Sequence, residues 1–125
     1  MHRWLIALMF AVAASQLLTA QAQAQNADNG KTVFRQICSI CHEAVAGKNR
    51  VGPSLFGIAG RKTGSVEGFH YSDANKNANL TWDDATLDRY LKDPRGTVPG
   101  TFMAYGGLKD DQKRKDLIAY LATLH

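Results

Sequence analysis

Hydrophobic residues recur at helical spacing in three parts of the chain, and long polar stretches separate these parts. The first set occupies positions i, i+4 and i+7 of one helix face: Gly30, Phe34 and Ile37. A cap at Asn26 or Asp28 would begin this helix, and the pattern continues to about Cys41. The pattern therefore predicts an amphipathic helix at the start of a folded domain.

Two further helices are predicted later in the chain. The sequence Thr81–Asp84 fits a capping box, T-x-x-D, and opens a helix that ends at Asp93-Pro94. Its apolar face carries Leu87, Tyr90 and Leu91. The last helix begins near Asp110, and we expect its stripe to pack on Gly30 and Phe34; the stripe is Leu117, Tyr120, Leu121 and Leu124. The basic run 113–115 is expected to face solvent, and residues 71–77 are expected to form a short helix.

Two long segments between these helices have the composition of loops. Residues 43–68 contain six glycines, and residues 95–107 contain Pro99 and four glycines. Loops of this length in a small domain are usually functional or are held by a bound group. The expected fold is all-α, with three main helices, short helices and long loops around a central group.

The N-terminal residues have the layout of a secretory signal peptide. A short positive start is followed by an apolar run of 11 residues, 4–14, and then by two A-x-A sites that end at Ala22 and Ala24. A membrane anchor is the alternative, but a span needs about 20 apolar residues. We expect residues 1–24 to be cleaved, residues 25–125 to form one domain, and the product to reach the periplasm.

The net charge and the length of the chain limit its possible functions. The chain has 125 residues, with 15 basic and 11 acidic residues and a formal charge of +4. Cleavage of the signal peptide would remove Arg3 and leave +3. No basic run supports nucleic-acid binding, and no stable membrane insertion is expected.

The most specific motif is Cys38-Ser39-Ile40-Cys41-His42, which reads C-x-x-C-H. This is the pattern for covalent attachment of a c-type haem. Each thiol can form a thioether to one vinyl group of the porphyrin, and the adjacent histidine can ligate the iron. Attachment also suits an exported protein, where free thiols would otherwise be oxidised to a disulfide.

Other readings of the cysteine pair are weaker. A zinc site needs a second pair of ligands, and the chain has no further cysteine. A thioredoxin-like redox pair normally follows a strand, whereas a helical pattern precedes this motif. A disulfide in an exported protein without haem remains as an alternative.

Met103 is the one thioether that remains after removal of the signal peptide, because the other methionines are Met1 and Met9. It lies in a segment rich in glycine and proline with few apolar neighbours. A buried methionine that fills a gap in the core is the alternative. The position favours a sixth ligand to iron, which together with His42 would fill both axial sites.

The mature chain resembles a class I cytochrome c of the mitochondrial and bacterial cytochrome c2 type over about residues 27–124. Besides the C-x-x-C-H motif, the resemblance rests on segments in the family's order: 52–55, 60–64, 71–77, 80–82, 90–91, 99–103 and 116–121. It implies one haem c, bound through Cys38 and Cys41 and ligated by His42 and Met103.

The resemblance also implies roles for the surrounding residues. The Pro53 segment would accept the second ring proton of His42, and Arg61, Tyr71 and Trp82 would surround the propionates. The hydrogen-bonded network near the methionine sulfur would comprise Asn75, Tyr90 and Thr101. Gly30, Phe34, Leu117 and Tyr120 would form the crossing of the terminal helices.

Some positions depart from the family pattern. Tyr105 replaces a usual Phe, while Phe102 and Ile37 stand where Lys is common. The ring of lysines that docks redox partners in the family therefore has fewer basic residues here, and Arg95 and Lys109 are among those that are left. His70 replaces a small polar residue, and we hypothesise that it titrates near a propionate; a solvated loop histidine is the alternative.

The resemblance implies a soluble, monomeric one-electron carrier rather than an enzyme. Its partners would be a cytochrome bc1-type donor and an oxidase, reductase or reaction-centre acceptor at the exposed haem edge, in respiratory or photosynthetic electron transport. A haem enzyme or gas sensor, with Met103 absent from the iron or easily displaced, is the competing class.

Overall fold

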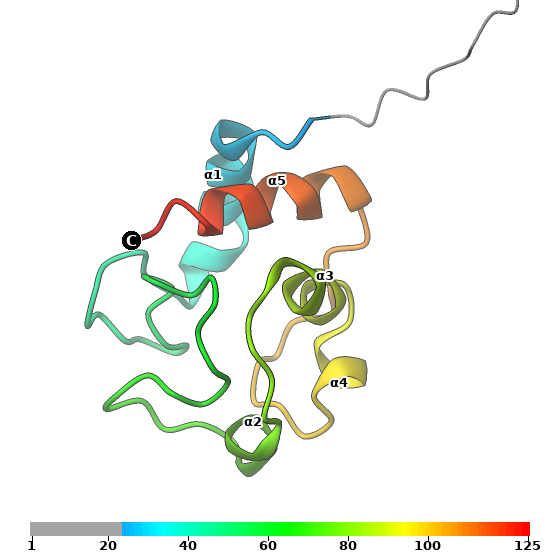
Figure 1. The fold of residues 1–125 in the computed structure, drawn as a ribbon. Coiled ribbons are helices and arrows are strands. Elements are labelled where there is room, and N and C mark those ends of the chain that lie inside the picture. Colours follow the sequence, from blue (N-terminus) through cyan, green and yellow to red (C-terminus); the bar gives the residue numbers. More distant parts are fainter. Residues whose placement is uncertain (1–23) are drawn as a thin grey trace, which may run out of the picture.

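The computed structural model describes residues 24–125 and shows a helical fold (Figure 1). Its elements, in order, are α1 (Ala27–Gln36), the 3₁₀ turn η1 (Cys38–Ile40), α2 (Asp73–Asn77), α3 (Asp84–Lys92), α4 (Pro94–Thr97) and α5 (Asp111–Leu121). Within these residues an isolated bridge between Lys62 and Thr81 is the one β-type pairing. The expected all-α fold with three main helices is confirmed.

The predicted signal segment falls mainly on residues 1–23, which lie outside the described residues, as does the site after Ala22. Among residues 24–125, none of the helices combines the length and apolar character that crossing a bilayer requires.

Helices α1 and α5 cross in direct contact, as Figure 1 shows. A Cβ on Gly30 would overlap the carbonyl group of Asp116 and the Cβ of Tyr120, so the backbones approach as only glycine permits. Beside this contact the rings of Phe34 and Tyr120 lie with centroids 5.3 Å apart. The predicted crossing of the terminal helices is therefore confirmed.

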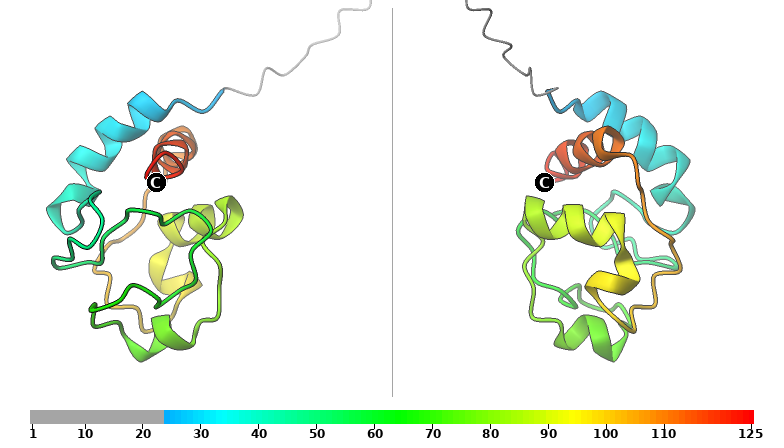
Figure 2. Two further views of the ribbon diagram at one scale, coloured as in Figure 1. Left: turned by 60° about the vertical axis from the view of Figure 1, so that its left-hand side comes forward. Right: turned by 90° about the vertical axis from the view of Figure 1, so that its right-hand side faces the viewer.

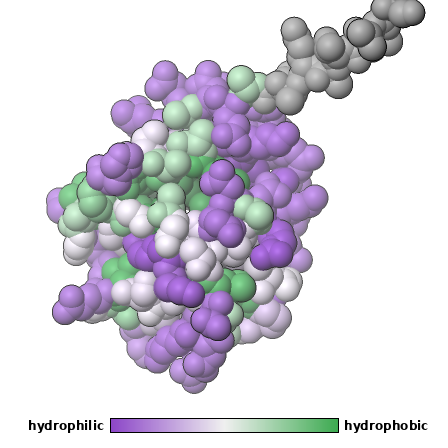
Figure 3. All heavy atoms as spheres, in the orientation of Figure 1, coloured by the Kyte–Doolittle hydropathy of each residue, from purple (hydrophilic) through white to green (hydrophobic). Residues whose placement is uncertain are grey.

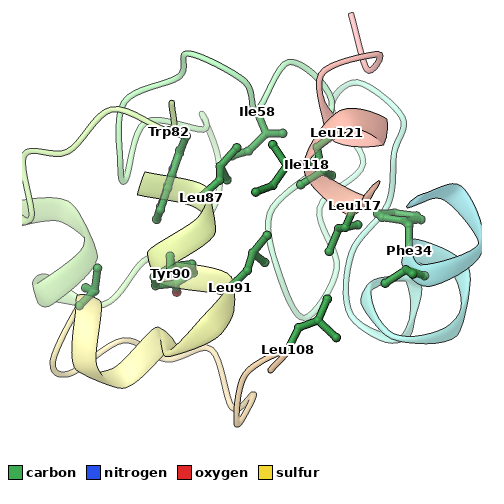
Figure 4. Close-up of a cluster of buried hydrophobic side chains, with 12 residues drawn as sticks. Phe34, Ile58, Trp82, Leu87, Tyr90, Leu91, Leu108, Leu117, Ile118 and Leu121 are labelled. Carbon is green, nitrogen blue, oxygen red and sulfur yellow. The ribbon is translucent and has the colours of Figure 1, made fainter. Parts of the chain in front are cut away.

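The core extends from this crossing to α3, as the buried side chains in Figure 4 show. Leu117 is 1% exposed and lies between α1 and α3. The core residues are Val33, Phe34, Ile58, Trp82, Leu87, Tyr90, Leu91, Val98, Leu108, Leu117, Ile118 and Leu121. Burial of about a dozen such side chains supplies the main driving force for folding.

The first helix ends earlier than the sequence predicts. Its cap, Asn26, accepts hydrogen bonds from the amides of Asp28 and Asn29, as expected. The helix stops at Gln36 rather than near Cys41, and Ile37 leaves the regular helical geometry. A tighter turn follows, in which the Cys41 amide donates to the Cys38 carbonyl at 3.1 Å. The cysteine motif therefore lies on a 3₁₀ turn and not on a continuous helix.

The N-terminal cap of α3 also differs from the one that the sequence predicts. Asp83, and not Thr81, accepts a hydrogen bond from the backbone amide of Thr86. Residues 81–82 are held extended, because the Trp82 amide donates to the Arg61 carbonyl at 2.8 Å. The predicted capping box is wrong because this pairing with residues 61–62 keeps Thr81 outside the helix.

The long loop 43–70 lies on the opposite side of the lower part of the molecule from α3 and α4 (Figures 1 and 2). Figure 2 shows residues 43–70 on one side, and α3 and α4 on the other. The loop is fastened to residues 80–82 by backbone bonds, including Gly60 N–H to the Trp82 carbonyl and Thr63 N–H to the Leu80 carbonyl, both at 2.9 Å.

The basic run 113–115 in α5 was expected to face solvent, but one of its three residues is buried. Lys113 and Lys115 are exposed, but Arg114 is 3% exposed. Its guanidinium pairs with Asp88 at 2.8 Å and with Asp111 at 2.6 Å. The prediction for Arg114 is wrong because position 114 lies on the same helix face as Leu117, Ile118 and Leu121.

Candidate haem-binding site

Cys38 and Cys41 lie at the start and just after the end of η1, and both are half-buried free thiols. Burial raises the pKa of the Cys38 thiol to about 11. A thioredoxin-like redox pair needs a thiol whose pKa is lowered. The buried Cys38 thiol does not have this property, and the position of both free thiols at one turn is compatible with attachment to one haem.

The ring of His42 is held in a fixed orientation by the segment that contains Gly52 and Pro53. Its Nδ1 atom lies 2.7 Å from the carbonyl oxygen of Pro53, the hydrogen bond expected between these two residues. A Cβ on Gly52 would overlap the imidazole, so a glycine is needed there. The ring nitrogen Nε2 makes no hydrogen bond with a described residue, which leaves it available as a ligand.

Burial lowers the pKa of His42, and the positive charge of Arg61 acts in the same direction, while the bond to Pro53 opposes them. The imidazole is therefore neutral at neutral pH. A neutral imidazole is the form that ligates a metal.

Met103 lies in the segment between α4 and α5, and it is half-buried against the core cluster. Its backbone amide donates to Thr101 Oγ1 at 3.3 Å, and Thr101 Oγ1 lies 2.7 Å from the hydroxyl of Tyr90 on α3. Burial raises the pKa of Tyr90, and the bond to Thr101 opposes this shift. Tyr90 and Thr101 thus fix the backbone next to the thioether.

The side chain of Arg61 is hydrogen-bonded to the backbone of the loop 43–68. Its two terminal nitrogens donate to the carbonyls of Phe56 and Ser54, each at 3.0 Å. Its Nε–H is buried and has no partner among the described residues. Burial lowers the pKa of Arg61, while Tyr71 raises it. An unpaired buried donor on a cation suits an anionic group such as a propionate.

Other residues assigned by the resemblance lie in the same region. Trp82 is buried, and its ring lies 4.8 Å from that of Tyr90. The hydroxyl of Tyr71 accepts from the amide of Val66 at 3.1 Å. The side-chain oxygen of Asn75 is buried without a partner, so no hydrogen bond joins it to Tyr90 and Thr101 in the described structure. An ordered water or a bound group would satisfy this oxygen.

These features together fit a haem. The structure provides two thiols on one turn, an oriented neutral imidazole, a thioether in a fastened loop, and two buried polar atoms without partners. Among the described residues no cluster of three or more His, Cys, Asp or Glu side chains suits a metal ion alone. Two thiols, one imidazole and one thioether are donors that suit a covalently attached porphyrin iron.

Of the residues that depart from the family pattern, Phe102 and His70 are exposed, whereas Ile37 and Tyr105 pack partly against the core. Phe102 is 68% exposed, and its ring centroid lies 6.2 Å from that of His70, which is also exposed. Burial is the main cause that raises the pKa of Tyr105, and the nearby Cys38 adds to it. On the face drawn in Figure 3, hydrophobic residues form small groups among polar ones.

Gly52 is the residue of this region whose contact the sequence did not reveal. The Gly52-Pro53 pair predicts a turn, whereas in the structure the glycine is the wall against the His42 ring. Gly52 follows His42 by ten positions, and no local pattern in the sequence indicates that the two residues touch.

Known proteins match the chain over most of its length. The family model described as cytochrome c matches residues 27–125. Cytochrome c2 of Blastochloris viridis is 48% identical over 120 residues, which cover 95% of this chain and 91% of the relative. Cytochrome c of Gibberella zeae is 52% identical over 93 residues, 74% of this chain and 88% of the relative.

A solved structure supports the same assignment. Cytochrome cH from Methylobacterium extorquens matches with a TM-score of 0.74 and 44% identity, covering 78% of this chain and 98% of that one. Proteins of this family carry electrons on a covalently bound haem c and are not enzymes. With its two thiols on one turn and its helical fold, this chain belongs to the cytochrome c family.

Proposed function

We propose that this chain is a soluble periplasmic one-electron carrier whose haem c is attached through Cys38 and Cys41 and ligated by His42 and Met103. The observation that carries the proposal is the 2.7 Å hydrogen bond between His42 Nδ1 and the Pro53 carbonyl. It fixes the tautomer, so that Nε2 carries the lone pair, and it increases the basicity of the ligand.

When bound, the haem iron supplies a ferric–ferrous couple, and histidine plus methionine ligation favours a high potential. The protein's contribution is rigidity. Pro53 orients His42, while Tyr90 and Thr101 hold the backbone at Met103. Because these groups are bonded before any charge change, little rearrangement is required of them during electron transfer.

The polar residues near the carboxylate side chains of the haem have a separate role. Arg61 and Trp82 come from different segments and are brought together by the pairing of residues 60–63 with 80–82, and Tyr71 lies near enough to Arg61 to raise its pKa. The unpaired Nε–H of Arg61 would compensate a propionate charge. Asn75, with Tyr90 and Thr101, would complete a polar network near the methionine sulfur through an ordered water.

The partners are proposed from the likeness to cytochromes c and c2. We propose that a cytochrome bc1-type donor and an oxidase, reductase or reaction-centre acceptor meet a single carrier molecule at the exposed haem edge. Phe102 is exposed there and carries no charge. A small interface with few charges suits brief encounters.

Export is proposed from the sequence of residues 1–24, with cleavage after Ala22 or Ala24. The placement of Asn26 is consistent with this cleavage, because its amide donates to the buried carboxylate of Asp116 at 2.9 Å. The folded domain therefore begins close after the proposed cleavage sites. Mass spectrometry of the protein recovered from the periplasm gives the first residue directly.

The deciding experiment is an optical spectrum of the haem-loaded protein, oxidised and reduced, with and without carbon monoxide. The proposal predicts a c-type spectrum with the weak sulfur-to-ferric-iron band and no change on adding carbon monoxide. A Met103→Ala variant should lose the band and bind carbon monoxide. Carbon monoxide binding by the wild-type protein would instead indicate an open site, as in a gas sensor or haem enzyme.

A further inference from the structure

The segment that carries Met103 is hydrogen-bonded to α3 near both of its ends but not in its middle. Towards its start, Thr101 bonds to Tyr90 of α3. Towards its end, the Leu108 amide donates to the Leu91 carbonyl of α3 at 2.8 Å. Residues 104–107 make no hydrogen bond with another described residue, and two of them are glycines. Among the described residues, hydrogen bonds thus hold this segment near its two ends, while the side chains of Met103 and Tyr105 pack partly against the core.

Arg114 reinforces the second of these ends. Its Nη1 donates to the carbonyl of Leu108 at 2.9 Å and to that of Lys109 at 3.2 Å. Its Nε donates to Asp88 Oδ1 of α3 at 2.8 Å, and its Nη2 donates to Asp111 at 2.6 Å. One buried guanidinium thus joins α5, α3 and the end of the Met103 segment.

The bond from Arg114 to Asp88 connects two helices, whereas its bond to Asp111 stays within α5. Asp111 belongs to the same helix as Arg114, so their pair orients the guanidinium but fastens nothing else. Asp88 lies on α3, two residues before Tyr90, which holds the other end of the segment. Arg114 and Tyr90 therefore attach both ends of the Met103 segment to the same helix, α3.

We propose that Arg114 and Asp88 are positioning residues for Met103, and that their ion pair restrains the release of this thioether from the iron. This inference rests on the proposed ligation by Met103. Fastening Leu108 shortens the free part of the segment to residues 104–107, and a short free segment has few conformations in which the sulfur is withdrawn. The backbone bond from Leu108 to Leu91 remains when the pair is lost, but Arg114 is then less firmly placed, so Leu108 detaches more readily and release of the thioether is favoured.

Imidazole provides a probe for this release, because it binds the ferric iron only where Met103 has left. Its apparent dissociation constant falls as the released fraction rises. Asp88→Asn removes the charge of the acceptor with little change in shape. Because the Asp88 side chain is 43% exposed, solvent screens the pair, and we expect about a threefold to fivefold tighter apparent affinity for imidazole.

The control is Asp84→Asn, one helical turn earlier on α3. It makes the same change of charge, but Asp84 has no side-chain bond or ion pair with another described residue. Imidazole affinity should stay within about twofold of wild type. Asp88→Glu keeps the carboxylate and should restore most of the wild-type affinity. Arg114→Lys, which cannot bond Asp88 and two carbonyls in the same fork geometry, should bind imidazole more tightly than Asp88→Asn does.

The outcomes separate this inference from the proposed ligation. Tighter imidazole binding by Asp88→Asn, with the sulfur-to-iron band still present before imidazole is added, supports it. Equal affinities for wild type, Asp88→Asn and Asp84→Asn overturn it, even if urea unfolding shows that Asp88→Asn is less stable. A wild-type protein without the sulfur-to-iron band overturns the ligation by Met103 itself.

Discussion

No side-chain carbon fits between Gly30 of α1 and the carbonyl group of Asp116 in α5. Two effects compete when alanine replaces this glycine. Alanine is favoured over glycine in a helix by about 1 kcal/mol, but its Cβ would force the two backbones apart. Separation of the helices also disturbs Phe34 and Tyr120, whose rings lie beside the contact.

For Gly30→Ala we therefore expect a net loss of about 2 kcal/mol in the free energy of unfolding, measured by urea denaturation of the haem-loaded protein. Gly106→Ala is the matched control. Nothing lies within 4 Å of a Cβ at position 106, and its φ is not positive. A Gly30→Ala protein as stable as this control would contradict the close packing described here.

Replacing Leu117 by alanine tests the centre of the core. Leu117 is 1% exposed and lies between α1 and α3. The truncation should lower the free energy of unfolding by about 3 kcal/mol, since it removes buried apolar surface and leaves a cavity. Ile40→Ala, at a position that is 67% exposed, should change it by less than about 0.5 kcal/mol. Thermal or urea unfolding of both variants gives the comparison.

The pair of Arg114 with Asp111 gives a prediction about pH. The hydrogen bond from Arg114 is the main cause that lowers the pKa of Asp111, and the charge of Arg114 adds to it. A carboxyl with a lowered pKa stabilises the folded state above its unfolded pKa of about 3.9, and this contribution is lost as the pH falls through the folded value.

Asp111→Asn should therefore be less stable than wild type at pH 6, and the difference should narrow as the pH falls below about 4. Urea unfolding at pH 6 and pH 3 measures both differences. A gap that is the same at the two pH values would show that the ion pair contributes nothing to stability.

Phe102 offers a test of the docking surface. It is 68% exposed beside the proposed ligand, so Phe102→Lys adds a positive charge close to the site of electron transfer. Oxidation of the ferrous protein by the anion ferricyanide should become about threefold faster at low salt, and the gain should disappear as salt screens the charge.

The control for this experiment is Val45→Lys, which adds the same charge at an exposed position of another loop. Stopped-flow rates at two ionic strengths measure both variants. If Val45→Lys accelerates the reaction as much as Phe102→Lys does, electron transfer does not take place near residue 102.

Local patterns in the sequence predicted much of the fold. The spacing of Gly30 and Phe34 predicted one face of α1, and that of Leu117 and Tyr120 predicted the face of α5 that packs on it. The cysteine motif and the family resemblance predicted the candidate haem site, because covalent attachment requires fixed residue types at fixed spacing.

The failures involve contacts between distant segments. Thr81 looks like a cap until Arg61 pairs with Trp82, and the pairing cannot be read from residues 81–84 alone. Arg114 looks like part of a solvated basic run, but its position relative to Leu117 and Leu121 places it on the buried face. Its carboxylate partner Asp88 lies 26 residues earlier in the chain, beyond the reach of local patterns.

The contact between α1 and α5 also affects when the chain can fold relative to its synthesis. Asn26 and Asp116, which are hydrogen-bonded in the folded protein, are 90 positions apart. A ribosome must therefore complete nearly the whole polypeptide before the terminal helices can meet, and until then α1 has no surface on which to pack. Late contact between the terminal helices would suit the proposed export in extended form, and it would leave both thiols accessible until the proposed haem is attached.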